Sequence, residues 1–169
     1  ENFNYLISTE KENFIFKTYT PNDDLIDLIE AENDALLFLN NQSKTTPTPI
    51  PFLDGKYVKP LIVNGQELTC RLLSFLEGQF LGDVKHSESL LSSFGTAVAQ
   101  LDLKLQSFKS YTIKARKFEW DIQHLFLNEK YIQDILVAKD RTLVNYFFQQ
   151  YKENVEPVIN DLRFAYIHN

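Results

Sequence analysis

The chain has 169 residues, of which 44% are hydrophobic and 24% are charged, and its formal net charge at pH 7 is -6. These values are typical of one globular domain or of one domain in two lobes, and an acidic chain without a basic block is a poor match for nucleic acid or an anionic membrane. No apolar run approaches the roughly 20 residues of a membrane-spanning helix. The single cysteine, Cys70, excludes an internal disulfide and favours a reducing, cytoplasmic setting.

Both ends of the sequence are unusual. The chain contains no methionine, even at position 1, and it finishes on a strand-like run that leads directly into His168 and Asn169. A complete gene product begins with methionine, and a strand at a chain terminus usually frays. We therefore expect the chain to be a fragment of a longer protein.

The first predicted elements are two strands joined by a polar turn. Residues 5–7 and 14–16 are rich in aromatic and branched side chains, and a polar stretch lies between them. Alternation along the second strand places Ile15 and Lys17 on one face and the two phenylalanines on the other.

The clearest helix is predicted over residues 20–41, with Asn22 or Asp23 as its N-cap. Its apolar residues recur at helical spacing: Leu25, Leu28, Ile29, Ala35, Leu36 and Leu39. Glu32 falls in the middle of this stripe. A buried carboxylate without a partner costs several kcal/mol, so we expect Glu32 to pair with a cation, and Lys17 is the nearest candidate in chain order. The alternative is that Glu32 reaches solvent along the helix edge and Lys17 is solvated.

A proline-rich connector and a second hairpin follow the helix. Residues 42–51 are polar and contain three prolines, which predicts an extended connector. Asn64-Gly65 is a strong signal for a hairpin turn, since both positions favour a positive φ. The return strand covers residues 68–78 and ends at Gly78.

The second half of the chain is predicted to be mostly helical. Helical periodicity covers residues 87–108, 120–136 and 144–162, and the last of these should bend or restart at Pro157. The first half is mostly sheet with one helix, so the sequence predicts a boundary between two lobes at residues 77–83.

Common catalytic motifs are not found in the sequence. His86 and His124 lie in helical surroundings and are more consistent with surface or packing positions. No spacing resembles a zinc site, and five scattered glycines leave no room for a phosphate-binding GxxxxGK[ST] loop or a GxGxxG motif. The chain therefore offers no metal ligand set of its own.

The order of the elements does resemble a known arrangement. A hairpin with Lys17, a helix with an inward Glu32, a connector, a hairpin and a helical lobe follow one another as in a kinase, and "FIFK" resembles the kinase "VAIK" element. More specifically, the chain resembles the aminoglycoside phosphotransferase family, near its hydroxylysine-kinase-like branch. The stretches that carry the resemblance are "NYLISTEKENFIFK", "IEAENDALLFLN", "TPIP", "RLLSFLEGQFL", "FGTAVAQLDLKL" and "LRFAYIHN".

The resemblance implies an α+β, protein-kinase-like fold. Residues 1–78 would form the nucleotide-binding small lobe and hinge, and residues 79–169 the helical part of an incomplete large lobe. Lys17 would contact the α- and β-phosphates, Glu32 would hold Lys17, and Ile15 would face the base.

The resemblance also assigns the hinge and the end of the chain. Ser74, Phe75 and Leu76 would be the hinge whose backbone groups bind the base, and His168 would open the catalytic-loop motif. The catalytic Asp and the metal-binding residues would lie beyond the chain, so the resemblance implies that this segment alone is inactive. One departure is Leu101-Asp102, where the family often has Leu-His.

The activity implied for the parent protein is transfer of the γ-phosphoryl group of ATP or GTP to a hydroxyl of an amino-containing small molecule, with Mg²⁺ bridging the phosphates. A fused pyridoxal-phosphate aminotransferase domain is also implied for some members. Two alternatives remain: a degenerate kinase-like module that binds nucleotide without catalysis, and a purely structural interaction domain.

Overall fold

The computed structural model describes residues 2–22 and 24–167. Contacts divide the chain into two compact units, one comprising Glu1–Lys114 with Ala165–Asn169 and the other Ala115–Phe164. The predicted lobe boundary at residues 77–83 falls in a stretch with little regular structure inside the first unit. The kinase-like division at residue 78 therefore remains a prediction that differs from the division into compact units.

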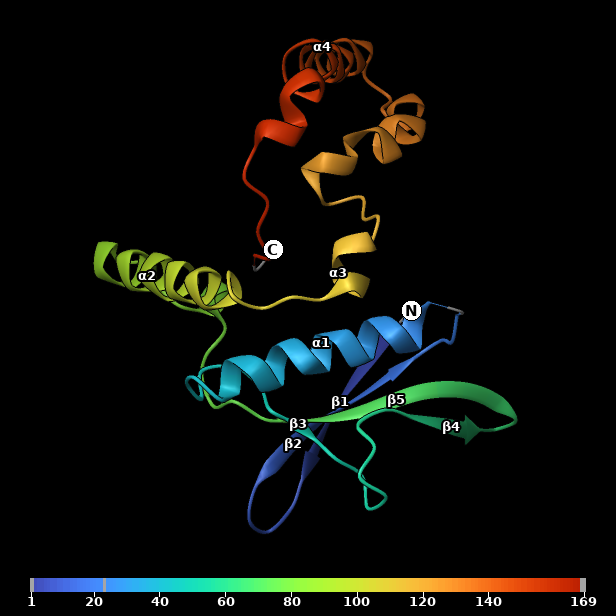
Figure 1. Cartoon of the computed structure of the whole chain (residues 1–169), viewed down its shortest axis with the longest axis vertical. Coiled ribbons are helices and arrows are strands. Elements are labelled where there is room, and N and C mark those ends of the chain that lie inside the picture. Colours follow the sequence, from blue (N-terminus) through green and yellow to red (C-terminus); the bar gives the residue numbers. More distant parts are fainter. Residues whose placement is uncertain (1, 23, 168–169) are drawn as a thin grey trace. The chain divides into compact units, whose positions relative to one another are not determined.

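The described part of the first unit is built on a five-stranded antiparallel sheet (Figure 1). Strand β5 pairs with β2, β3 and β4, and β1 forms the edge beside β2. The strands are β1 (Asn2–Ser8), β2 (Asn13–Tyr19), β3 (Pro49–Ile50), β4 (Lys59–Val63) and β5 (Gln66–Ser74). The predicted first hairpin is confirmed, and so is the turn between β4 and β5, where Asn64 and Gly65 have φ values of 51° and 80°.

The register between β2 and β5 fixes which side chains share a face. Lys17 lies directly opposite Arg71, and Ile15 lies opposite Leu73, so these four residues project from the same face. On the other face, the ring of Phe16 contacts that of Tyr5, with 6.5 Å between centroids. The predicted alternation along β2 is confirmed.

Helix α1 (Leu25–Asn40) covers the face that carries Lys17 (Figure 1). Ile29, which is 1% exposed, packs in a cluster with Tyr19 of β2 and with Val58. The helix begins after Asp24, whose side chain makes no capping hydrogen bond, and the candidate cap Asp23 lies outside the described residues. This packing places the middle of α1 above the facing pair in β2 and β5.

A second cluster in the same unit joins α1 to α2 (Glu88–Leu105). Leu39 of α1 packs against Leu105 and Phe108. The short helices η1 (Leu81–Asp83) and α3 (Tyr111–Ala115) were not predicted from the sequence. The hydroxyl of Tyr166 donates to the Ser110 carbonyl at 2.7 Å and accepts from its N–H at 3.2 Å, so the chain returns to this unit near its end.

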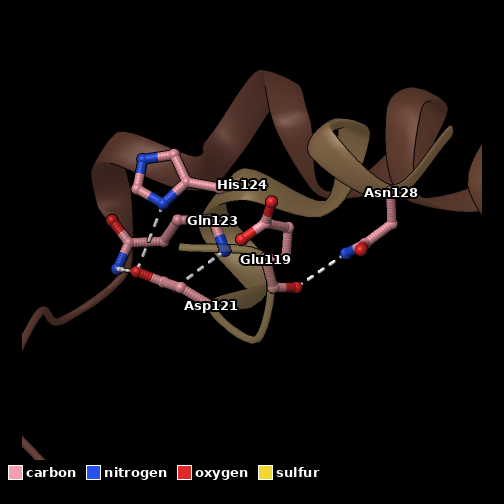
Figure 2. Close-up of polar contacts among 5 residues, drawn as sticks. All are labelled: Glu119, Asp121, Gln123, His124 and Asn128. Atoms are coloured by element: carbon pink, nitrogen blue, oxygen red, sulfur yellow. Dashed lines mark hydrogen bonds and ion pairs between the residues drawn. The ribbon is translucent and has the colours of Figure 1, made fainter. Parts of the chain in front are cut away.

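The second unit contains η2 (Ile122–Asp134), α4 (Ala138–Asn154) and η3 (Glu156–Asp161). The helical pattern predicted over residues 120–136 corresponds to η2, which is a 3-10 helix interrupted at His124 and not a regular α-helix. Figure 2 shows polar contacts around the start of η2: Asp121 accepts from the Gln123 N–H at 2.9 Å as its N-cap, and Asn128 donates to the Glu119 carbonyl at 2.6 Å.

The third predicted helix has the expected bend. Helix α4 ends at Asn154 and η3 begins at Glu156, with Pro157 at the start of the new helix. Proline lacks the N–H that would continue the earlier helix, but it is tolerated in a first turn. None of the helices in the described residues has the length and apolar character needed to cross a membrane.

Candidate functional site

Lys17 lies in the middle of β2, on the face beneath α1. Its partners across the strands are Arg71 in β5 and the uncharged Asn4 in β1. Its ammonium lies 5.9 Å from the centre of the Tyr19 ring. The side chain is only partly exposed, so this cation is held in a restricted environment between the sheet and the helix.

Glu32 has a cationic partner, but that partner is Arg71 rather than Lys17. The Glu32 Oε2 atom accepts from Arg71 Nη2 at 2.8 Å, whereas no ion pair within 4.0 Å joins Lys17 to Glu32 in the part of the chain that the structure describes. The prediction of a direct Lys17–Glu32 pair is therefore corrected. That prediction rested on chain order, because Lys17 lies on the strand that precedes the helix of Glu32. Strand pairing, however, places Arg71 directly opposite Lys17.

Arg71 is the functional candidate that sequence reasoning missed. Its side chain is 5% exposed, and it donates through Nη1 to Asn33 Oδ1 at 3.0 Å in addition to its bond with Glu32. Its guanidinium also lies 5.6 Å from the centre of the Tyr19 ring. A signal for it exists in the sequence, because a charge in the apolar run of the return strand must find a partner if that strand is buried.

The electrostatics of this face act on Lys17. Burial lowers the pKa of Lys17, the nearby positive charge of Arg71 lowers it further, and Glu32 partly offsets these effects by raising it. One carboxylate thus stands beside two cations, which leaves an excess of positive charge on this face. Such a lysine favours an anionic ligand, since the anion would replace the missing countercharge.

The predicted hinge is partly paired with its neighbours. The Ser74 N–H donates to the Thr48 carbonyl at 2.8 Å, and the Phe75 N–H donates to the Asn13 carbonyl at 3.2 Å. The expectation that the N–H near Ser74 is free is wrong, because β5 continues in the sheet up to this residue. Leu76 follows the strand, is exposed, and makes no backbone hydrogen bond to any other described residue.

Ile15 lies on the same face as Lys17, opposite Leu73 in β5. The structure therefore brings Ile15, Lys17 and Arg71 together on one face and places Leu76 just beyond the end of β5. Two hollows beside α1 lie elsewhere. One of about 350 Å³ borders residues 108–112, and another of about 490 Å³ borders residues 56–60.

The remaining candidates give no catalytic centre within the described residues. His168 lies outside them. His86 is exposed and contacts the Leu81 carbonyl at 2.8 Å, and His124 lies 3.4 Å from Asp121 in a local contact (Figure 2). Among the residues that the structure describes, no group of three or more His, Cys, Asp or Glu side chains can hold a metal ion.

Comparisons with known proteins agree on one family. The model of the family described as "Phosphotransferase enzyme family" matches residues 1–169. Among curated proteins, the chain is similar to hydroxylysine kinase of Mus musculus, with 26% identity over 151 residues, and to hydroxylysine kinase of Bos taurus, with 26% identity over 145 residues. Each match covers 81% of this chain and 38% of the relative.

Solved structures show the same fold. A microcompartment-associated aminopropanol kinase superposes with a TM-score of 0.71 and 21% identity, over 93% of this chain and 50% of that protein. The amicoumacin kinase hAmiN, solved with AMP-PNP, Ca²⁺ and Ami, gives a TM-score of 0.62 and 19% identity, over 97% of this chain and 47% of that protein. The predicted α+β, kinase-like fold is confirmed, and the chain spans half or less of the length of these relatives.

Proposed function

Because the chain belongs to the phosphotransferase enzyme family, we propose that the whole protein transfers the γ-phosphoryl group of ATP or GTP to a hydroxyl group of a small molecule that also carries an amino group. The observation that carries this proposal is the partly buried Lys17 on the face beneath α1, beside one carboxylate and a second cation. Phosphoryl transfer depends mainly on positioning and charge stabilisation, and a lysine in such a setting supplies both.

Each residue on this face has a proposed role. The ammonium of Lys17 would bind the α- and β-phosphates, and Ile15 would contact the base. The N–H and C=O of Leu76 are available for hydrogen bonds to the base, because no described residue uses them. Ser74 and Phe75 would set the path of the hinge through their bonds to neighbouring strands.

The proposed acceptor follows from the relatives. Two of them are named for hydroxylysine and one for aminopropanol, and both molecules combine an amino group with a hydroxyl group. A divalent cation such as Mg²⁺ is expected to neutralise the phosphates in the whole protein. The described residues do not fit a metal site of three or more ligands, so no step through the metal is assigned to this chain.

Two further features belong to the proposal. A reducing, cytoplasmic setting is favoured because Cys70 is a free and buried thiol. The fused pyridoxal-phosphate aminotransferase domain and the inactivity of the isolated segment stay predictions from the family resemblance.

The experiment is phosphoryl transfer from γ-labelled ATP or GTP to hydroxylysine and to aminopropanol by the whole protein. Transfer should fall on the order of 100-fold in Lys17→Met, the scale of losing one charge-stabilising donor. The matched control is Lys11→Met, which removes an exposed lysine from the turn of the same hairpin. Nucleotide binding without transfer would indicate the degenerate module instead, and absence of both would indicate an interaction domain.

A further inference from the structure

Arg71 is a buried cation placed directly across from the proposed phosphate ligand. It faces Lys17 in the register between β2 and β5. Its guanidinium uses two different nitrogens to reach two consecutive residues of α1, Glu32 at 2.8 Å and Asn33 at 3.0 Å. Asn33 is fully buried, so these bonds lie between the helix and the sheet.

The bond between Arg71 and Glu32 determines where the carboxylate lies. Arg71 is 5% exposed, whereas Glu32 is 38% exposed, so the cation has less access to water than its partner. Releasing Glu32 would leave a buried guanidinium without its countercharge, which is strongly unfavourable. The carboxylate is thus held by β5 through Oε2, while its other oxygen has no recorded partner among the described residues.

We propose that Arg71 is a positioning residue of the nucleotide site: it fixes α1 to the sheet through Glu32 and Asn33 and keeps one carboxylate shared between itself and Lys17. This inference rests on the proposed function. Arg71 is not itself a phosphate ligand, because its guanidinium is buried and already bonded to α1. Lys17 is left only partly neutralised and therefore available to the phosphates.

The charges around Lys17 are consistent with a Glu32 carboxylate that acts on both Arg71 and Lys17. Arg71 from β5 lowers the pKa of Lys17 and Glu32 from α1 raises it, after the larger effect of burial. The facing residue in β1, Asn4, carries no charge. Removing either partner should therefore move the pKa of Lys17, and the two removals should move it in opposite directions.

The geometry also predicts that lysine cannot replace Arg71. The planar guanidinium reaches Glu32 and Asn33 at the same time through separate nitrogens, whereas an ammonium is a single point charge. A lysine at this position would retain the positive charge but could not bond Glu32 and Asn33 through two separate nitrogens. The conservative variant therefore separates a requirement for charge from a requirement for position.

The test is performed on the whole protein with AMP-PNP as the probe. The variants are Arg71→Lys, Arg71→Gln and Glu32→Gln, and the control is Lys59→Gln, which removes a cation of an exposed ion pair with Asp54 in the same unit. The dissociation constant is measured by calorimetry. The pKa of Lys17 is measured by NMR of labelled lysine, assigned with Lys17→Met.

We expect Arg71→Lys to weaken AMP-PNP binding on the order of tenfold, the effect of about 1.4 kcal/mol, while Lys59→Gln leaves it unchanged. The pKa of Lys17 should rise in Arg71→Gln and fall in Glu32→Gln. Arg71→Lys keeps the buried charge, so it provides the decisive comparison if Arg71→Gln does not fold.

Failure of this inference can be told apart from failure of the proposed function. If Lys17→Met binds AMP-PNP as tightly as the unmodified protein, the site assignment itself is wrong. If Lys17→Met loses binding while Arg71→Lys retains it fully, only the positioning role of Arg71 is overturned. Equal pKa values for Lys17 in the folded Glu32→Gln variant and the unmodified protein would also overturn it.

Discussion

Replacing Ile29 by alanine tests whether α1 is fixed to the sheet as the structure describes. Ile29 is 1% exposed and packs against Tyr19 and Val58. The change removes three carbon atoms, which at about 0.8 kcal/mol each gives about 2.4 kcal/mol of lost transfer free energy. A residual cavity adds to this loss, so we expect the free energy of unfolding to fall by about 3 kcal/mol.

Ile26 is the matched control, since it is the same residue type one turn earlier on the same helix. It is 46% exposed, so Ile26→Ala should cost only about 1 kcal/mol. The higher helix propensity of alanine offsets a few tenths of a kcal/mol in both variants and cancels in the comparison.

The free energies of unfolding of both variants are measured by urea unfolding of the whole protein, monitored by circular dichroism. A stability change shifts the urea concentration at the midpoint and leaves the dependence of the free energy on urea concentration unchanged. We expect the free energies of unfolding of the two variants to differ by about 2 kcal/mol. Equal costs, or a larger cost for Ile26→Ala, would refute the assignment of Ile29 to the face that meets the sheet.

Other substitutions test the contact of Tyr166, the conformations of two glycines and the electrostatics of Lys17. Tyr166→Phe should lower the free energy of unfolding by about 1 kcal/mol in urea unfolding, because two bonds to Ser110 are lost, while Tyr131→Phe, at an exposed ring, should not. Gly65→Ala should lower the free energy of unfolding by about 1 kcal/mol, because φ at this position is 80°. Gly95→Ala should raise it by about 0.5 kcal/mol, because Gly95 lies in α2 with open space around it. Changes of the same sign in the two variants would contradict this expectation. The pKa of Lys17 in the folded state lies below its ordinary value of 10.5, so between these two values the unfolded chain binds more protons than the folded chain. The free energy of unfolding, measured relative to that of Lys17→Met, should therefore rise with pH across this window. A difference that does not change with pH would refute this expectation.

Local signals predicted much of the first unit. The alternation in β2, the apolar stripe of α1 and the Asn64-Gly65 turn each depend on residues close in sequence, and each is confirmed. The position of Glu32 correctly indicated a cationic partner. Which cation it would be depends on strand register, and no local pattern in the sequence fixes that Arg71 lies opposite Lys17.

The other missed features concern the type of one helix and two contacts between distant segments. The 3-10 geometry of η2 and its interruption at His124 are not indicated by the helical period of its apolar residues. The Ser74 N–H is paired because Thr48, in the proline-rich connector, returns beside β5. The contact of Tyr166 with Ser110 likewise joins segments that are distant in sequence.

Backbone hydrogen exchange at residues 74–76 of the whole protein, with and without AMP-PNP, tests the nucleotide site most directly. The amides of Ser74 and Phe75 already donate to Thr48 and Asn13, so they should exchange slowly in both states, whereas Leu76 has no partner among the described residues and should exchange fast until nucleotide binds. We expect protection of the Leu76 amide to appear with AMP-PNP and to disappear in Lys17→Met. Saturating AMP-PNP with no change at Leu76, or protection that Lys17→Met leaves intact, would contradict the assignment of this sheet face and hinge to the nucleotide.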